Sequence, residues 1–224
     1  MKSSFIMKID YLKSFDNIPY FTISGFKQVL HAGESDTQRI RAMLSRWVKI
    51  GHVIRLKKGV YMTRRFYELN QNHASFASAV SSIILPQSYV SLEYVLQRAS
   101  ILTEITYPIT AITLKNTREI ENDLGTFVYR HIKLPLYTGF IQETFFGVIF
   151  HQASIAKALY DYFYLRPLPR SLRTHTINLA EELRLNLDEL PTSVRSEFKN
   201  YIDLNNSPKM TFIYKNLRET IWQP

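Results

Sequence analysis

The sequence predicts an α+β fold in two parts. The 224 residues are 46% hydrophobic and 21% charged, close to the average of globular proteins, which excludes disorder as the main state. Helical spacing of apolar residues dominates residues 1–70, and β-forming stretches alternate with helical patterns in residues 71–224. The charge changes at the same place: residues 1–70 hold 13 basic and 5 acidic residues, and residues 71–224 hold 15 and 14. We therefore predict one domain over residues 1–70 and a second over residues 71–224.

The basic charge is concentrated further within the first domain. Residues 36–65 contain nine basic residues and one acidic residue, Asp36. Such a block repels itself, so an anionic partner would stabilise it. A solvated basic surface is the alternative explanation, and the choice depends on whether the charges share one face.

A helix over residues 35–51 is predicted with both of its ends marked. Ser35 is a suitable N-cap, and Gln38, three residues later, completes a capping box. Gly51 follows the last periodic residue, where a left-handed conformation commonly ends a helix. Apolar residues recur at i, i+3, i+4, i+7 and i+8, which predicts one buried stripe: Ile40, Met43, Leu44, Trp47 and Val48.

The opposite face of this helix is polar and basic. A turn of 100° per residue places seven residues away from the buried stripe: Gln38, Arg39, Arg41, Ala42, Ser45, Arg46 and Lys49. Their amide and guanidinium groups are of the kind that contact base edges and phosphates in DNA. For this helix alone, an ordinary amphipathic surface helix is an equally good interpretation.

A predicted β-hairpin follows the helix and changes that balance. Residues 53–56 and 60–62 form its strands, and residues 57–59, Lys-Lys-Gly, form a tight turn with glycine where a positive φ is needed. A shorter helix begins near Ser24 and reaches the main helix through a short glycine-containing turn, as in a helix-turn-helix. A further helix is predicted over residues 6–15. This order of elements predicts a winged helix-turn-helix that binds DNA.

The second domain is predicted to be mixed α/β with a helical tail. Apolar periodicity predicts helices over residues 74–85, 91–99 and 154–165 and near residues 176–185, 193–204 and 208–221. Runs of β-formers predict strands over residues 109–114, 125–131 and 145–150. No Pro/Gly/Ser-rich linker separates the two domains.

The sequence lacks the usual signatures of an active site. It contains no Cys, which excludes disulfides, Cys-based zinc sites and thiol nucleophiles, and its six His residues are scattered without ligand spacing. Glycine-rich nucleotide-binding motifs do not occur. Glu197-Phe198-Lys199 has the E-x-K pattern of a nuclease, which requires a strand, but Val194, Phe198 and Ile202 predict a helix there. We therefore expect no enzyme activity, no metal site and no cofactor.

A cytoplasmic location is expected. Lys8 and Asp10 interrupt the apolar run near the N-terminus, so no signal peptide is predicted. The longest stretch without charged residues, 69–92, contains six serines and Pro86, which favours a helix and turn over a membrane span.

Three segments resemble one family. Residues 44–61, LSRWVKIGHVIRLKKGVY, resemble the winged-helix domain of AbiEi-type antitoxins of type IV toxin–antitoxin pairs. Residues 89–96, with 108–113 downstream, and residues 153–162 resemble the second domain of the same family. In the last segment, Ile155-Ala156 replaces the family's usual Pro-Glu before Lys-Ala-Leu-x-Asp. Lys157 and Asp161 there have i, i+4 spacing, which we interpret as a structural pair on the helix surface.

The resemblance implies a DNA-binding antitoxin that represses its own operon. It would bind inverted repeats in the promoter and counteract a nucleotidyltransferase-type toxin of that operon, without requiring a stable complex with it. The predicted DNA contacts lie on the main helix and on the wing: Thr37, Gln38, Arg39, Arg41, Ser45, Arg46, Lys49, Lys57 and Lys58. Two other classes stay open: a winged-helix regulator whose C-terminal domain binds a small molecule, and a DNA-processing enzyme.

Overall fold

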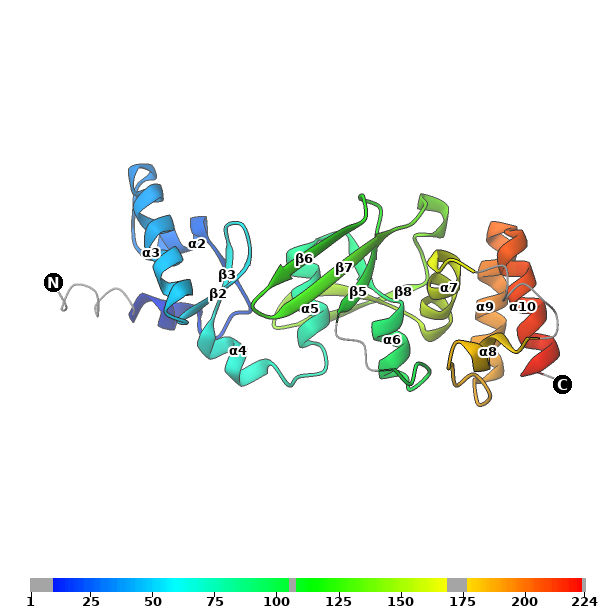
Figure 1. Ribbon diagram of the computed structural model, residues 1–224. Coiled ribbons are helices and arrows are strands. Elements are labelled where there is room, and N and C mark those ends of the chain that lie inside the picture. The colour runs from blue at the N-terminus through cyan, green and yellow to red at the C-terminus, as the bar shows by residue number, and fades with distance from the viewer. Residues whose placement is uncertain (1–9, 105–107, 169–176, 223–224) are drawn as a thin grey trace. The chain divides into compact units, whose positions relative to one another are not determined.

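The chain forms two compact units. The computed structural model describes residues 10–104, 108–168 and 177–222 (Figure 1). Unit 1 comprises Met1–Pro86 together with the hairpin ends Glu121–Gly125 and Thr144–Phe150. Unit 2 comprises Gln87–Ile120, Thr126–Glu143 and His151–Pro224. The domain boundary predicted at residue 70 rests on the change in charge along the sequence. The division into compact units does not test it, so it stays a prediction.

Unit 1 contains a three-stranded antiparallel sheet and a set of short helices. Its strands are β1 (Phe21–Thr22), β2 (Val53–Lys57) and β3 (Val60–Thr63), in the order β1-β3-β2. Its helices are η1 (Asp10–Phe15), α2 (Ile23–Val29), η2 (Glu34–Asp36), α3 (Thr37–Lys49), α4 (Arg64–Asn70) and α5 (Phe76–Ile84). The predicted hairpin and the two helices directly before it, α2 and α3, are confirmed as elements. Residues 6–9 of the predicted first helix lie outside the described residues, and its described part is a 3-10 helix.

The two ends of α3 differ in how well the sequence predicted them. The predicted N-cap Ser35 is wrong, because Ser35 lies inside η2 and α3 begins at Thr37. The 3-10 turn is closed by the Gly33 N–H, which donates to the Asp36 carboxylate at 3.3 Å. At the other end, Gly51 has the expected positive φ of 81°. The N–H of Gly51 donates to Val48 O at 3.1 Å and the N–H of His52 to Trp47 O at 2.9 Å, the two bonds of a Schellman motif.

Aromatic residues fill the core beneath α3. Ile40, Leu44 and Trp47 are at most 3% exposed, which confirms the predicted buried stripe at these positions. The ring of Trp47 packs edge-on against Phe26, with centroids 5.7 Å apart. The core is completed by residues of the neighbouring elements: Leu12, Phe15, Phe21, Val53 and Tyr61. Burial of this area fixes the orientation of α3, so its polar face is turned outward.

A six-stranded mixed sheet has the order β6-β7-β5-β4-β9-β8. Its strands are β4 (Ser88–Val90), β5 (Ile109–Thr113), β6 (Arg118–Asn122), β7 (Gly125–His131), β8 (Phe140–Phe145) and β9 (Val148–Ala153). β5 pairs antiparallel with β4 and parallel with β7, and β4 pairs parallel with β9. The α+β class is therefore confirmed.

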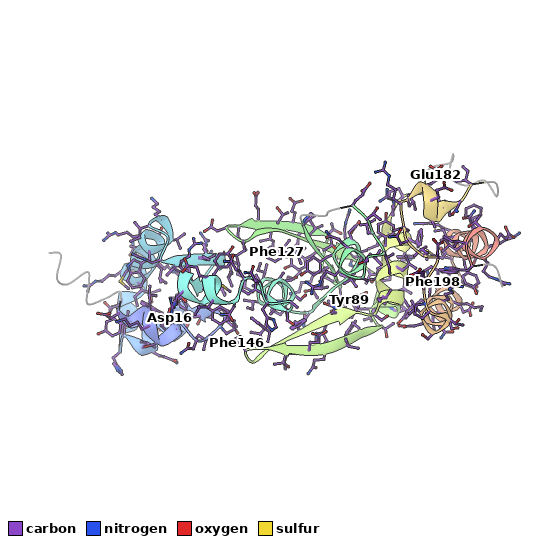
Figure 2. All side chains as sticks on the ribbon, turned by 90° about the horizontal axis from the view of Figure 1, so that it is seen from below. Asp16, Tyr89, Phe127, Phe146, Glu182 and Phe198 are labelled. Atoms are coloured by element: carbon purple, nitrogen blue, oxygen red, sulfur yellow. The ribbon has the colours of Figure 1, made fainter. Side chains whose placement is uncertain are left out.

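The predicted strand over residues 145–150 is wrong. Phe146 and Gly147 form the turn between β8 and β9, with φ values of 46° and 78°. Two positive φ values are typical of a two-residue type I′ turn, a conformation that a phenylalanine rarely adopts. Figure 2 shows Phe146 at the end of this hairpin, where its side chain is 55% exposed. Two strands and their turn thus replace the single predicted strand.

The helices of unit 2 are grouped around α7. They are α6 (Glu93–Arg98), η3 (Leu134–Leu136), α7 (Ile155–Leu165), α8 (Leu179–Glu182), α9 (Thr192–Asn205) and α10 (Pro208–Thr220). α7 contacts α6, α9 and α10, and α9 and α10 lie side by side (Figure 1). Part of the helix predicted over residues 176–185 falls on Thr176, outside the described residues, and its described remainder is the shorter α8.

Candidate nucleic-acid interface

The outward face of α3 is basic. All seven residues predicted to face away from the core are exposed: Gln38, Arg39, Arg41, Ala42, Ser45, Arg46 and Lys49. Met43 and Val48 flank the buried stripe and are half-buried. Six of the seven α3 residues predicted to contact DNA are therefore brought onto one solvent-facing surface, which we call the α3 face.

The cations of the α3 face have no acidic partner in the part of the chain that the structure describes. Arg39, Arg41, Arg46 and Lys49 form no ion pair there with any described carboxylate. An unpaired, solvated guanidinium keeps its five N–H donors available for a phosphate or a base edge. The α3 face is therefore suited to an anionic partner with closely spaced charges.

Thr37 differs from the other candidates because its hydroxyl is already engaged. It donates to Glu34 O at 2.8 Å and accepts a hydrogen bond from Lys27 Nζ at 3.1 Å. Lys27 also pairs with the Glu34 carboxylate at 2.7 Å. The hydrogen bond and the charge of Lys27 lower the pKa of Glu34. Thr37 thus helps to hold the start of α3 against α2.

The two lysines of the predicted wing are not equivalent. Lys58 is exposed at the turn between β2 and β3, and Gly59 beside it has a φ of 79°, as predicted. Lys57 is half-buried and donates from Nζ to Ile84 O at 2.9 Å, so its ammonium is tied to α5. The turn is anchored to α2, because the N–H of Ile23 donates to Gly59 O at 3.3 Å. Lys58 is therefore better placed than Lys57 to meet a phosphate.

Arg55 is a further exposed cation near α3 that was not among the predicted DNA contacts. Arg55 lies in the middle of β2 and is exposed, whereas its neighbours Ile54 and Leu56 are buried. The alternation of apolar and charged residues in this strand could have predicted from the sequence that Arg55 is exposed. β2 packs against α3.

Helix α7 also carries a cation, but there the cation is buried and paired with a carboxylate. Lys157 and Asp161 form the expected ion pair, but the prediction that it lies on the helix surface is wrong, because both side chains are 0% exposed. The Asp161 carboxylate also accepts hydrogen bonds from Tyr89 Oη at 3.0 Å and Ser91 Oγ at 2.8 Å. Lys157 Nζ lies 5.2–5.6 Å from the ring centroids of Tyr89, Tyr160 and Tyr201.

Burial dominates the protonation of this pair. It lowers the pKa of the Lys157 ammonium and raises the pKa of the Asp161 carboxyl, and the attraction between the two groups opposes both shifts. Burial and the neighbouring carboxylate also raise the pKa of Tyr89. This network joins α7 to β4 and α9, and the ion pair at its centre is fully buried.

The remaining chemical motifs are accounted for by local structure. Glu197 of the E-x-K triplet lies on helix α9, as predicted, and accepts hydrogen bonds from Ser154 Oγ at 2.6 Å and Tyr201 Oη at 2.8 Å. Within the described residues, no group of three or more His, Asp or Glu side chains is arranged to hold a metal ion. None of the described helices has the length and apolar character needed to cross a membrane.

Comparison with known proteins adds no further residue assignments. No protein-family model matches the chain, and no curated protein matches it. The candidate interface therefore rests on the exposure, charge and hydrogen bonding of its own residues.

Proposed function

We propose that the protein is a DNA-binding antitoxin and transcriptional autorepressor that acts in the cytoplasm. Residues 1–70 would form a winged helix-turn-helix, with α3 as recognition helix and the β2–β3 turn as wing. The protein would bind inverted repeats in the promoter of its own operon. It would counteract a nucleotidyltransferase-type toxin of that operon without the need for a stable complex.

The observation that carries the DNA-binding proposal is the α3 face. Four cations, Arg39, Arg41, Arg46 and Lys49, are exposed on the side of α3 opposite the buried Ile40, Leu44 and Trp47, without described acidic partners. Major-groove recognition needs such a helix, because its outward side chains must reach base edges while its apolar side stays in the core.

The order of the elements supports the same proposal. α2 and α3 are joined by a short segment that contains Gly33, and a hairpin with exposed Lys58 at its turn follows directly. β1 extends that hairpin on the β3 side and so completes a small sheet. In a helix-turn-helix the second helix enters the major groove, and an exposed lysine on an adjacent hairpin is suited to the phosphate backbone.

The antitoxin part of the proposal comes from the resemblance to AbiEi-type antitoxins. It is carried by residues 44–61 in the first domain and by residues 89–96 and 153–162 in the second. Since almost all of the charge imbalance lies in residues 1–70, repression and toxin neutralisation are expected to depend on different parts of the chain.

Arg41→Ala tests this division of labour. The side chain is exposed, so the variant keeps the buried stripe of α3 and is expected to fold normally. Loss of its contact should weaken operator binding by about 1–3 kcal/mol and derepress the operon. We expect the same variant still to protect cells from the toxin of the operon. The measurement is a promoter-reporter assay beside a toxin-rescue assay at equal expression.

Arg184→Ala is the matched control. Arg184 is an exposed arginine of unit 2 whose side chain pairs with Glu104 at 3.2 Å, so its removal should leave repression unchanged. Full repression by Arg41→Ala would contradict the recognition role of α3. Loss of both repression and rescue by Arg41→Ala would contradict an independent antitoxin domain.

A further inference from the structure

Strand β2 of the hairpin contains a β-bulge. Arg55 is paired with Tyr61 of β3. Two residues further along β2, Lys57 is paired with Val60, so Leu56 is an extra residue without a counterpart in β3. Cross-strand partners lie on one face of a sheet, and successive residues of a strand lie on opposite faces. Arg55 and Lys57 therefore point to opposite faces of the hairpin, whereas a regular strand would have placed them on the same face.

The two faces of the hairpin have different neighbours. Tyr61 belongs to the core beneath α3, together with Val53, which lies two residues before Arg55. The face that carries Arg55 is therefore the one that packs against α3, and the Arg55 side chain is exposed there. Lys57, on the other face, donates from Nζ to Ile84 O of α5 at 2.9 Å. The bulge thus directs Arg55 to the α3 side of the hairpin and Lys57 to the α5 side.

A side chain from outside the hairpin holds the bulge. Asn122 Nδ2 donates to Leu56 O at 3.0 Å, so the carbonyl group of the extra residue has a partner. Asn122 Oδ1 accepts a hydrogen bond from Leu124 N–H at 2.8 Å, which fixes the orientation of the Asn122 amide. The segment Glu121–Gly125 belongs to the same compact unit as the hairpin. Asn122 therefore restrains β2 at the residue that follows Arg55.

We propose that Arg55 binds a phosphate of the DNA backbone beside α3, and that Asn122 is a positioning residue for it. The inference rests on the proposed function, because it adds a contact to the same DNA interface. Arg55 forms no ion pair with any described carboxylate. A guanidinium can form two parallel hydrogen bonds with a phosphate, and a side chain on a restrained strand is positioned more precisely than one on a loop.

Arg55→Ala tests the phosphate contact. We expect the slope of log K against log[salt] to flatten by about 0.9, the value for one lost phosphate contact, and the affinities for operator and unrelated duplex DNA to fall by the same factor. Fluorescence anisotropy of the full chain at several salt concentrations measures both. Arg184→Ala removes an equal charge from unit 2 and should leave the slope unchanged. An unchanged slope in Arg55→Ala, or a loss confined to operator DNA, contradicts the phosphate contact.

A double-mutant cycle tests the role of Asn122. If Asn122 acts by positioning Arg55, Asn122→Ala should weaken DNA binding by at least about twofold in the wild-type background and have no effect in Arg55→Ala. A general loss of stability would instead weaken binding by the same factor in both backgrounds. Equal effects in the two backgrounds, or no effect in either, would overturn the positioning role.

Arg41→Ala, measured in the same assay, separates this inference from the proposed function. If Arg41→Ala weakens DNA binding and Arg55→Ala does not, only the inference about Arg55 is wrong. If neither substitution weakens binding, the proposed DNA interface is wrong, and the inference about Arg55 is wrong with it.

Discussion

Arg41 and Lys157 are both cations on helices, and the difference between their surroundings separates the proposed DNA-binding surface from a structural core. Arg41 is exposed on α3 and has no described ionic partner. Lys157 is fully buried on α7, paired with Asp161 and surrounded by three tyrosine rings. A solvated cation costs the fold little and remains able to bind an anion. A buried cation depends on its partner, because its desolvation must be offset.

The largest expected effect comes from breaking the buried pair. Lys157→Met leaves the Asp161 carboxylate buried without its counter-ion, so we expect the free energy of unfolding to fall by about 3–5 kcal/mol. Lys199→Met is the matched control, because Lys199 and Asp203 have the same i, i+4 spacing on α9 but are exposed. That change should have little effect on the free energy of unfolding, because solvent screens an exposed ion pair. Urea denaturation of both variants measures the difference, and equal losses would contradict the structural role of Lys157.

A second replacement sharpens the interpretation of that loss. Lys157→Met combined with Asp161→Leu removes the uncompensated charge but leaves Tyr89 Oη and Ser91 Oγ without their acceptor. The double variant should therefore be more stable than Lys157→Met alone and less stable than the wild type. Denaturation under the same conditions tests this, and a double variant less stable than Lys157→Met would argue against a buried charge as the cause.

The wing gives a smaller effect on DNA binding. Lys58→Ala should flatten the dependence of log K on log[salt] by about 0.9, the value for one lost phosphate contact. Lys57→Ala should flatten it less, because the Lys57 ammonium donates to Ile84 O. Fluorescence anisotropy with duplex DNA at several salt concentrations measures both slopes. A slope unchanged in Lys58→Ala would remove the wing from the proposed interface.

The smallest effect concerns the start of α3. Lys27 lowers the pKa of Glu34, so this carboxylate contributes stability above its ordinary pKa and loses that contribution as the pH falls through its folded-state pKa. In Lys27→Met the pKa of Glu34 should return toward 4.5, its ordinary value. An NMR titration of the Glu34 carboxyl in both proteins measures the shift, and the same pKa in both would exclude Lys27 as its cause.

Local patterns predicted the α3 face well. The spacing of Ile40, Leu44 and Trp47 identified the buried side of the helix, and Gly51 identified its end, because both features depend on residues close in sequence. The N-cap was misplaced because the sequence around Ser35 is equally compatible with a capping box and with a 3-10 turn. The choice between them involves Lys27, ten residues from Thr37 in sequence.

The buried pair could not have been recognised from its own helix. Lys157 and Asp161 at i, i+4 have the spacing of an ordinary surface pair. Their burial depends on Tyr89 and Tyr201, which lie far away in the sequence. The β8–β9 turn was missed for a related reason, since propensity alone does not predict a phenylalanine at positive φ.

The central claim, that the α3 face binds DNA, is tested most directly by anisotropy titrations of the chain's own promoter DNA with wild type, Arg41→Ala and Arg184→Ala. We predict that Arg41→Ala raises Kd by about 5- to 150-fold, the equivalent of 1–3 kcal/mol, and that Arg184→Ala binds as the wild type does. Equal affinity of Arg41→Ala and the wild type, or equal weakening by the two substitutions, would contradict the claim.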